Sequence, residues 1–423
     1  MNHPARLARW TRLTGACALL GTLVAGAAIP ATGAFAASPG VRQSPAAVSA
    51  ATGRLPVLDP AALRASIAGL PDGDVTGALL RVTGSAGAWT GTSGVGDLTT
   101  GAPVPADGHV RIGSVSKVFT AAVVLQLAAE RRVDLDAPVQ RYLPRVLPTG
   151  LKPMTVRQLL NHTSGMPRPA ASPEFGDGSA EWFAVNRSAS FTPQRVVDLV
   201  KGQPMAFEPG TAQQYNGINY FVAGMLVERV TGHSFAHEVR ARLTGPLGLR
   251  DTQVPDAHDT RLPAPYSHGY LTVTGADGTP APVDVSRQSP WPWSEGGMIS
   301  TPSDLDRFLG ALIGGRLLPP AQQAELFAVP DVPSYRNSQC RTATDAGRAC
   351  MSAGLMRVKT EEGVVVWGKT GSRPGYTSGM FATRDLSRRV VYALNPRTLT
   401  GSEFRLIPAM VAAAFGTITP TAN

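Results

Sequence analysis

Ser114-Val115-Ser116-Lys117 is a Ser-x-x-Lys match that opens a long apolar segment. Apolar side chains recur there at helical spacing as far as Arg131-Arg132, which predicts a buried helix. Residues three apart share one helix face, so Ser114 and Lys117 can touch, and a helix N-terminus offers N–H groups to a developing oxyanion. The stretch therefore predicts a nucleophilic serine with a lysine partner. A helix-capping serine beside a solvated lysine is the alternative.

Lysine is scarce in this chain, which makes each lysine position informative. The 423 residues include five lysines, at positions 117, 152, 201, 359 and 369. Lys369 opens Lys369-Thr370-Gly371, which follows a predicted strand and precedes Ser372. Lys369 and Thr370 would offer a charge and a hydroxyl to a substrate carboxylate, and Gly371 lets a substrate approach the backbone. The backbone N–H of Ser372 would be the second oxyanion donor, so we expect a substrate-binding strand rather than an ordinary strand and turn.

The order of predicted elements indicates one folded body over residues 56–418. A helix opened by Asp59-Pro60 and running to about Leu70 comes first, with strands over 75–82 and 88–95. The last part has strands predicted over 354–359, 363–368, 377–383 and 389–394, and a closing helix over 403–415. Residues 134–314 are predicted as an inserted all-helical subdomain. The fold class is therefore α/β (α+β), with an antiparallel sheet flanked by helices and completed by both ends of the chain.

Four further segments stand in the same order as the two lysine motifs: Leu135–Val139, Leu159–Met166, Pro209–Thr211 leading to Tyr215, and Glu295–Thr301. With them, the chain resembles the serine β-lactamases and penicillin-binding DD-peptidases from about Pro56 to Phe415. The closest likeness is to soluble D-alanyl-D-alanine carboxypeptidases of Streptomyces type and to class C β-lactamase-like hydrolases. The resemblance implies a β-lactamase/transpeptidase-like fold and an acyl-enzyme at Ser114. It also implies that Tyr215 shuttles protons and that no metal or other cofactor takes part.

The middle motif of that family, Tyr-x-Asn, is incomplete in this sequence. Tyr215 aligns with the tyrosine, but the asparagine position is Gly217. In the family the asparagine side chain hydrogen-bonds the lysine and the substrate amide, so its loss would cost on the order of 1–3 kcal/mol if nothing replaces it. Asn216 and Asn219 are the nearest amides, although adjacent residues usually point elsewhere. An impaired or retuned site is therefore an open alternative.

Two further residues are weaker candidates for binding substrate. The resemblance suggests that Arg357, on the strand before Lys-Thr-Gly, helps to clamp a substrate carboxylate; a surface salt bridge is the alternative. Trp291 would wall the cleft, or would simply pack as a loop aromatic. His233 and His237 lie four residues apart before Glu238, but the sequence provides no further ligand, and we predict no metal site.

The N-terminus predicts export. Residues 1–36 combine three arginines, an apolar region and the small-x-small site Ala34-Phe35-Ala36, as in a cleaved signal peptide, with a retained anchor as the alternative. Residues 37–55 are predicted as an Ala/Ser/Pro-rich linker, and no spanning apolar run follows. Two cysteines would remain, Cys340 and Cys350, which favours a disulfide in an oxidising compartment over two lone thiols. We expect a secreted or cell-wall-associated protein.

Charge and motif content limit the partners. The chain carries 39 basic and 30 acidic residues, and removal of residues 1–36 leaves 36 and 30, a modest excess suited to anionic surfaces such as peptidoglycan. It contains neither the basic-aromatic stripe of a nucleic-acid binder nor a Gly-x-Ser-x-Gly elbow. We expect a monomeric serine hydrolase that takes a small peptide or a β-lactam, as a D-alanyl-D-alanine carboxypeptidase. The alternatives are a β-lactamase, esterase or D-amino acid amidase, or a penicillin- or wall-binding protein with little turnover.

Overall fold

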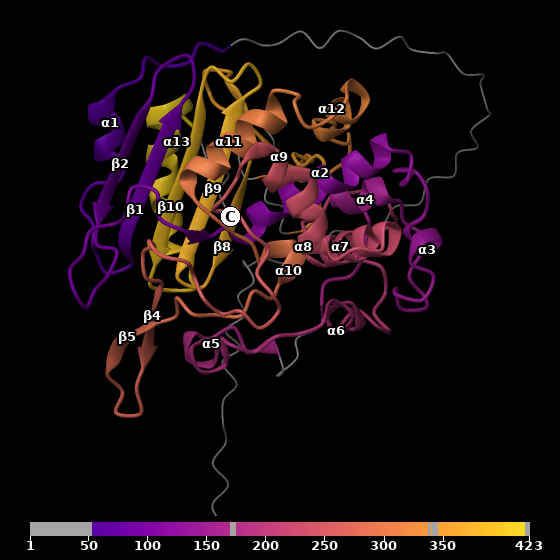
Figure 1. Cartoon of the computed structure of the whole chain (residues 1–423), viewed down its shortest axis with the longest axis horizontal. Helices are drawn as coiled ribbons and strands as arrows, with labels where there is room; N and C mark the ends of the chain where they lie inside the picture. The colour runs from indigo at the N-terminus through magenta and orange to yellow at the C-terminus, as the bar shows by residue number, and fades with distance from the viewer. Residues whose placement is uncertain (1–52, 170–174, 337–339, 341–345, 419–423) are drawn as a thin grey trace, which may run out of the picture.

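The computed structural model describes residues 53–169, 175–336, 340 and 346–418. The predicted signal peptide and nearly all of the predicted linker lie outside the described residues. A six-stranded antiparallel sheet forms the framework, in the order β2-β1-β10-β9-β8-β7 (Figure 1). Its strands are β1 (Val75–Thr83), β2 (Trp89–Gly94), β7 (Met356–Lys359), β8 (Val365–Arg373), β9 (Tyr376–Thr383) and β10 (Arg389–Pro396). Because β1 pairs with β10, both ends of the chain complete one sheet, as predicted.

Helices cover both faces of the sheet, which confirms the predicted fold class. On one face, α1 (Pro60–Ala65) packs against α13 (Ile407–Phe415), and their apolar side chains share a core with β1 and β10. On the other face lie α2 (Ser116–Ala129) and α11 (Pro302–Ile313). Figure 1 shows α11 in front of the sheet and α13 behind it. α13 follows a 3₁₀ turn, η5 (Ser402–Leu406), so the closing helix is shorter than predicted.

The helix α2 is apolar around its whole circumference, which explains its central place. Its side chains are buried on every face, and Phe119 stacks on Phe308 of α11 with ring centroids 3.7 Å apart. A helix of this kind is stable only inside a large core. It begins after a 3₁₀ turn, η1 (Gly113–Val115), that contains Ser114. The predicted helix therefore starts two residues later than expected, and the serine stands on the turn that leads into it.

The inserted region is mostly helical but not entirely so, which corrects the expectation of an all-helical subdomain. Its helices are α3 (Val139–Tyr142), α4 (Val156–Leu160), α5 (Ala180–Asn186), α6 (Pro193–Asp198), α7 (Ile218–Thr231), α8 (Phe235–Val239), the π-helical turn η3 (Arg240–Thr244), α9 (Gly245–Leu247) and α10 (Trp293–Gly296). A hairpin of β4 (Tyr270–Thr274) and β5 (Pro280–Asp284) projects from this region (Figure 1). Its turn contains Asp277-Gly278, with Gly278 at a positive φ of 82°. Such a turn is a hairpin signal. Two short segments also pair, β3 (Val110–Arg111) with β6 (Ile299–Ser300).

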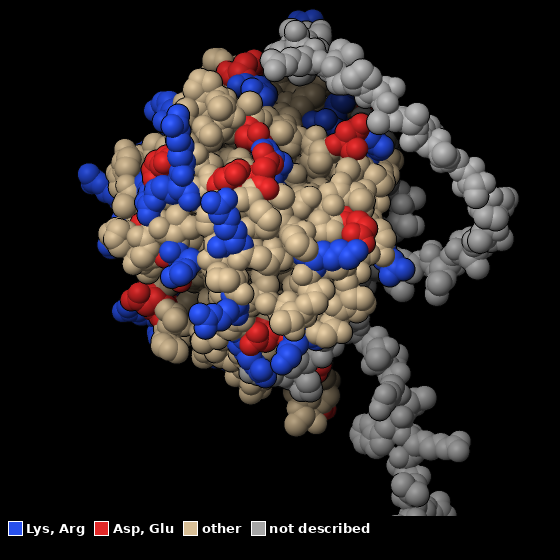
Figure 2. Space-filling view, turned by 90° about the vertical axis from the view of Figure 1, so that its right-hand side faces the viewer, with Lys and Arg blue, Asp and Glu red and all other residues tan. Residues whose placement is uncertain are grey.

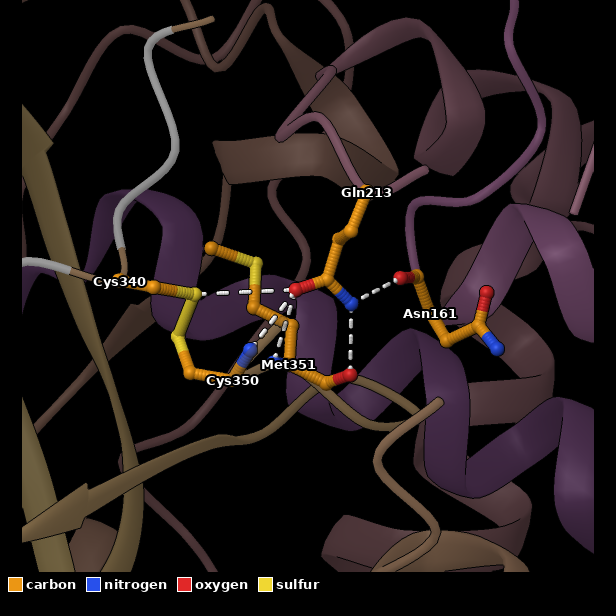
Figure 3. Close-up of a disulfide and its surroundings, with 5 residues drawn as sticks. All are labelled: Asn161, Gln213, Cys340, Cys350 and Met351. Carbon is orange, nitrogen blue, oxygen red and sulfur yellow. Dashed lines mark hydrogen bonds between the residues drawn. A yellow bond between two sulfur atoms is a disulfide. The ribbon is translucent and has the colours of Figure 1, made fainter. Parts of the chain in front are cut away.

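A disulfide joins Cys340 and Cys350, as the sequence predicts, and follows α12 (Pro320–Leu326), a helix that comes after the inserted region. Figure 3 shows the side chain of Gln213 beside this disulfide. Its Nε2 donates to the carbonyls of Asn161 (2.7 Å) and Met351 (2.8 Å), and its Oε1 accepts from the backbone N–H groups of Cys350 and Met351. Gln213 therefore connects the disulfide-bonded segment to the chain that leads, two residues later, to Tyr215.

Charge is spread over the surface rather than gathered in one place on the face that Figure 2 presents. There, Lys and Arg side chains alternate with Asp and Glu (Figure 2). Among the residues that the structure describes, no helix is both long enough and apolar enough to cross a membrane.

Candidate active site

Two glycines allow the turn η1 to lie against the edge of β8. A Cβ atom on Gly113 would stand 2.4 Å from the backbone nitrogen of Ser372, and one on Gly371 would stand 2.0 Å from the carbonyl oxygen of Ile112. Both distances are far inside van der Waals contact, so only glycine fits at either position. β7 pairs with β8 only between Val365 and Gly368, which leaves the Lys369–Ser372 edge beside η1. The two motifs predicted to work together therefore meet.

The hydroxyl of Ser114 lies between a lysine and a tyrosine. Lys117 Nζ donates a hydrogen bond to Ser114 Oγ at 2.9 Å, and Tyr215 Oη donates to the same oxygen at 2.7 Å. Lys117 comes from the first turn of α2, whereas Tyr215 precedes α7 by three residues. Ser114 is partly exposed, so a substrate can reach it, and the lysine behind it is fully buried. This geometry suits a serine nucleophile with two proton-transfer partners.

Lys117 has a second set of partners, all supplied by Glu295 of α10. Its Nζ donates to the Glu295 carbonyl oxygen at 2.8 Å and also contacts Glu295 Oε1. Burial by itself would lower the pKa of Lys117, but the charges of Glu295 and then Tyr215 outweigh burial and raise that pKa above its ordinary value. Lys117 is therefore a cation in the resting site, held by a carboxylate.

Tyr215 is neutral at rest and firmly held. Burial raises the pKa of its phenol, and this effect exceeds the opposing influence of Lys117. The ring packs on His162 with centroids 4.7 Å apart, and Lys369 Nζ lies 4.9 Å from the ring centroid. Burial, helped by Lys117 and Lys369, holds the pKa of His162 well below its usual value, so His162 supports the tyrosine as a neutral ring.

The two asparagines nearest to Gly217 are engaged away from Lys117. Asn216 Nδ2 donates to the carbonyls of Met166 (2.9 Å) and Pro167 (3.0 Å). Asn219 Oδ1 accepts from Ser164 Oγ at 2.8 Å, and its Nδ2 lies 3.3 Å from His162 Nδ1. Neither amide therefore replaces the asparagine that the motif lacks.

Lys369 lies within β8 rather than after a strand, because β8 continues to Arg373. Its side chain is buried, and Nζ donates to the carbonyl oxygen of Thr370 at 2.9 Å. Burial, followed by repulsion from Lys117, lowers the pKa of Lys369 to about 7. Its charge therefore changes near neutral pH, which makes its affinity for an anionic group dependent on pH. Thr370 is half-buried, and Ser372 is exposed at the end of the same edge.

The weaker candidates lie around this centre. Arg357 of β7 pairs with Trp367 of β8, and strand alternation places both on the sheet face that carries Lys369. Trp291 packs against an aromatic cluster with centroid distances of 5.2–5.5 Å to Phe175, Phe191 and Phe221. Its ring is half-buried, and it lies two residues before α10. The packed-aromatic interpretation thus has direct support, and a cleft-wall role stays a prediction.

Sequence reasoning missed Glu295 as a site residue. The segment Glu295–Thr301 contributed only to the family resemblance, and its acidic side chain stood among glycines and apolar residues. That isolation, together with the missing asparagine, was the available signal. Because Glu295 is 178 residues from Lys117 in the chain, only the fold reveals their contact.

One group of metal-ligating side chains occurs among the described residues. His233, His237 and Glu238 place ligand atoms within 4.8 Å of one another, so Glu238 provides the third ligand that the sequence lacked. Both carboxylate oxygens of Glu238 are already engaged, one by His233 Nδ1 and the other by Arg242 Nε. His237 and Glu238 belong to α8 and His233 precedes that helix, away from Ser114 in sequence and element, so we assign the cluster no role in the site.

Comparison with known families agrees with the geometry. A family model described as Beta-lactamase matches residues 63–415. The chain therefore belongs to the β-lactamase family, and it is a serine hydrolase of the β-lactamase and penicillin-binding protein superfamily. Similar proteins include an esterase, a penicillin-binding protein and two amide hydrolases.

Two curated relatives and two solved structures illustrate this range. Esterase EstB of Burkholderia gladioli is 33% identical over 211 residues, which cover 48% of this chain and 50% of the esterase. Penicillin-binding protein 4* of Bacillus subtilis is 25% identical over 76% of this chain and 68% of that protein. A D-stereospecific amidohydrolase from Streptomyces sp. has a TM-score of 0.71 and 32% identity, covering 83% of this chain and 98% of that one. A D-amino acid amidase from Ochrobactrum anthropi SV3, in complex with L-phenylalanine, has a TM-score of 0.68 and 25% identity. The match covers 84% of this chain and 98% of the amidase. The matched part spans about half the length of the esterase.

Proposed function

We propose that this protein is an exported serine hydrolase that forms an acyl-enzyme at Ser114 and cleaves D-alanyl-D-alanine-type amides as a carboxypeptidase. The observation that carries the proposal is the position of Ser114 Oγ, 2.9 Å from Lys117 Nζ and 2.7 Å from Tyr215 Oη. Family membership and similarity to penicillin-binding proteins support the chemistry, and similarity to D-specific amidases supports the D configuration.

The proposed reaction has two stages. Lys117, a cation at rest, first gives a proton to the Glu295 carboxylate that it contacts. Ser114 Oγ then attacks the amide carbonyl carbon while its proton passes to the neutral amine of Lys117, and the backbone N–H groups of Ser114 and Ser372 hold the oxyanion. Tyr215 then protonates the departing amine, and the acyl group stays on Ser114 as an ester. Water releases the acid in the second stage, or an amine takes the acyl group in transpeptidation.

Strand β8 would provide most of the groups that bind the substrate. Lys369 and Thr370 would hold the terminal carboxylate, with Arg357 as a further cation on the same face of the sheet. Since the pKa of Lys369 is about 7, this clamp would be strongest below neutral pH. Ser372 is exposed and would offer its backbone N–H to the substrate, whereas Gly371 is buried against η1 instead of facing the substrate as the sequence suggested. Trp291 would border the cleft. The natural partner in this proposal is a peptidoglycan-type peptide, bound by a monomeric enzyme outside the cytoplasm.

A D-amino acid amidase is the second candidate, because the solved structures of a D-stereospecific amidohydrolase and a D-amino acid amidase match most of this chain. An amide substrate lacks the terminal carboxylate, so it would not need a charged Lys369. A β-lactamase or an esterase uses the same acylation groups and differs in the leaving group. A wall-binding protein with little turnover is the alternative outside the enzymes.

Steady-state assays with four substrates separate these functions. Purified protein should hydrolyse a peptide ending in D-Ala-D-Ala faster than D-alanine amide, a chromogenic cephalosporin or a short-chain ester, and Ser114→Ala should abolish all of these activities. Peptide turnover no faster than that of Ser114→Ala would overturn the carboxypeptidase proposal. Preference for the amide would establish the amidase instead. Sequencing the N-terminus of secreted protein checks export, and cleavage after Ala36 is expected.

A further inference from the structure

The space beside Gly217 is occupied by Glu295. A Cβ atom added to Gly217 would lie 2.8 Å from Glu295 Oε1 and 3.2 Å from Glu295 Cγ and Cδ. An asparagine at position 217 and the glutamate at position 295 in its present conformation would therefore overlap. The same Oε1 atom contacts Lys117 Nζ, the group that the family's asparagine would hydrogen-bond.

The backbone around Glu295 is fixed against both helices of the site. Ser294 Oγ donates to the carbonyl of Tyr220 in α7 at 2.9 Å, and Thr120 Oγ1 of α2 donates to the carbonyl of Ser294 at 2.7 Å. A Cβ atom on Gly297 would stand 1.9 Å from the carbonyl oxygen of Pro290, so the segment closes tightly behind α10. With its backbone held in this way, Glu295 presents both its carbonyl and its carboxylate to Lys117.

The groups that face Glu295 come from several elements and are mostly cationic. Lys117 of α2 and Tyr215 before α7 interact with its charge most directly. Lys369 and Arg373 of β8 also experience its charge, which raises the pKa of each in opposition to burial. The Glu295 side chain is 16% exposed. A neutral amide in its place would leave the buried Lys117 without a counter-charge.

We infer that Glu295 is the positioning residue of this site, and that its carboxylate replaces the asparagine side chain absent at Gly217. It acts through Lys117, which it orients toward Ser114 and keeps charged in the resting state. This inference rests on the proposed acylation at Ser114 and adds to it a residue that the family motif does not include. Where the family has a neutral amide, this chain has a negatively charged carboxylate. The pKa of Lys117 is therefore higher than it would be beside an asparagine.

The first test measures the titration of Lys117 directly. The chain has five lysines, so ¹³C-lysine spectra are simple enough to assign with Lys117→Met. In Glu295→Gln, the titration of Lys117 should move to lower pH by about one unit or more, because an opposite charge in contact has been removed. Glu325→Gln, which removes one of the two carboxylates paired with Arg157, is the control and should leave the titration of Lys117 unchanged. An unchanged titration in folded Glu295→Gln would overturn the inference.

The second test asks whether asparagine and glutamate are interchangeable. Acylation of Ser114 by a fluorescent penicillin should slow about 10- to 100-fold in Glu295→Ala, and Gly217→Asn alone should also slow it by displacing Glu295. The double variant Glu295→Ala/Gly217→Asn should regain at least about tenfold over Glu295→Ala, because it restores Tyr-x-Asn. Melting temperatures should show that each variant is folded. If the acylation rate of the double variant falls by the product of the two single-variant losses, the asparagine does not replace Glu295 and the inference is wrong.

The two proposals fail in distinguishable ways. If wild-type protein is not acylated at Ser114 while the Lys117 titration still shifts in Glu295→Gln, the proposed function fails and the Glu295–Lys117 coupling stands. If wild-type protein is acylated and neither the titration nor the double variant responds as described, the inference about Glu295 fails and the proposed function stands.

Discussion

At the residue scale, Tyr215 offers the cleanest separation of chemistry from packing. Its hydroxyl donates to Ser114 Oγ, whereas its ring packs against His162 and beside two lysines. Tyr215→Phe keeps the ring and removes the proton. We expect acylation by penicillin to slow on the order of 10²- to 10⁴-fold with an unchanged melting temperature, as loss of a general acid–base group typically does. A reduction below about threefold would show that Tyr215 only packs.

Lys369 gives a prediction about pH. Burial and Lys117 lower its pKa to about 7, so its charge is present below that pH and lost above it. If this charge binds a terminal carboxylate, KM for a D-Ala-D-Ala peptide should rise about tenfold between about pH 7 and pH 8.5. KM for D-alanine amide, which has no carboxylate, should not follow this trend. In Lys369→Met the pH dependence should disappear, and its persistence would assign it to another group.

Single residues were predictable from sequence when a motif spacing identified them. Ser114 and Lys117 lie three residues apart, and their contact follows from local backbone geometry. Tyr215 required the family resemblance, because no local spacing connects it to Ser114. Glu295 was not predicted as a site residue, since its partner Lys117 is 178 residues away in the chain and nothing in the sequence near Glu295 points to that partner.

At the scale of elements, the contact between η1 and β8 decides whether an oxyanion can be held. A Cβ atom on Gly371 would meet the Ile112 carbonyl at 2.0 Å, so Gly371→Ala must push β8 away from η1. We expect acylation to slow on the order of 10²- to 10³-fold, as when one oxyanion donor is lost. Gly73→Ala, where a Cβ would meet nothing within 4 Å, is the matched control and should retain wild-type rates. Equal rates for both variants would contradict the proposed role of the Ser372 N–H.

The segment that carries the disulfide depends on Gln213. Its side chain satisfies two buried carbonyls and two backbone N–H groups of three other residues (Figure 3). Gln213→Leu leaves these groups without that partner, so the free energy of unfolding in urea should fall by about 2–4 kcal/mol. Gln126→Leu, which loses one bond to the Leu317 carbonyl, should cost about 1 kcal/mol or less. Equal costs would show that Gln213 has no special anchoring role.

Elements were predicted well where their signals were strong. The sheet strands near both ends alternate or run apolar between turn residues, and their positions agree within a few residues with the structure. The hairpin β4–β5 was missed because its second strand, Pro280–Asp284, contains two prolines and is largely exposed. β8 is longer than predicted because polar residues of the Lys-Thr-Gly motif continue the ladder with β9.

At the scale of the whole molecule, the sheet depends on contacts between the first and last strands. Val75 pairs with Pro396, more than 300 residues away in sequence, and β8 reaches η1 only because β9 and β10 place it there. The sequence predicts this closure from the order of elements, but the position of α10 between α2 and α7 follows from packing alone. The contact between Glu295 and Lys117 is therefore apparent only in the folded structure.

Acylation of Ser114 can be observed by mass spectrometry of intact, penicillin-treated protein. We predict one added penicillin mass per chain, located by proteolysis on the peptide that contains Ser114 and absent from Ser114→Ala. No adduct on folded wild-type protein, or an adduct that persists in Ser114→Ala, would show that Ser114 is not the nucleophile.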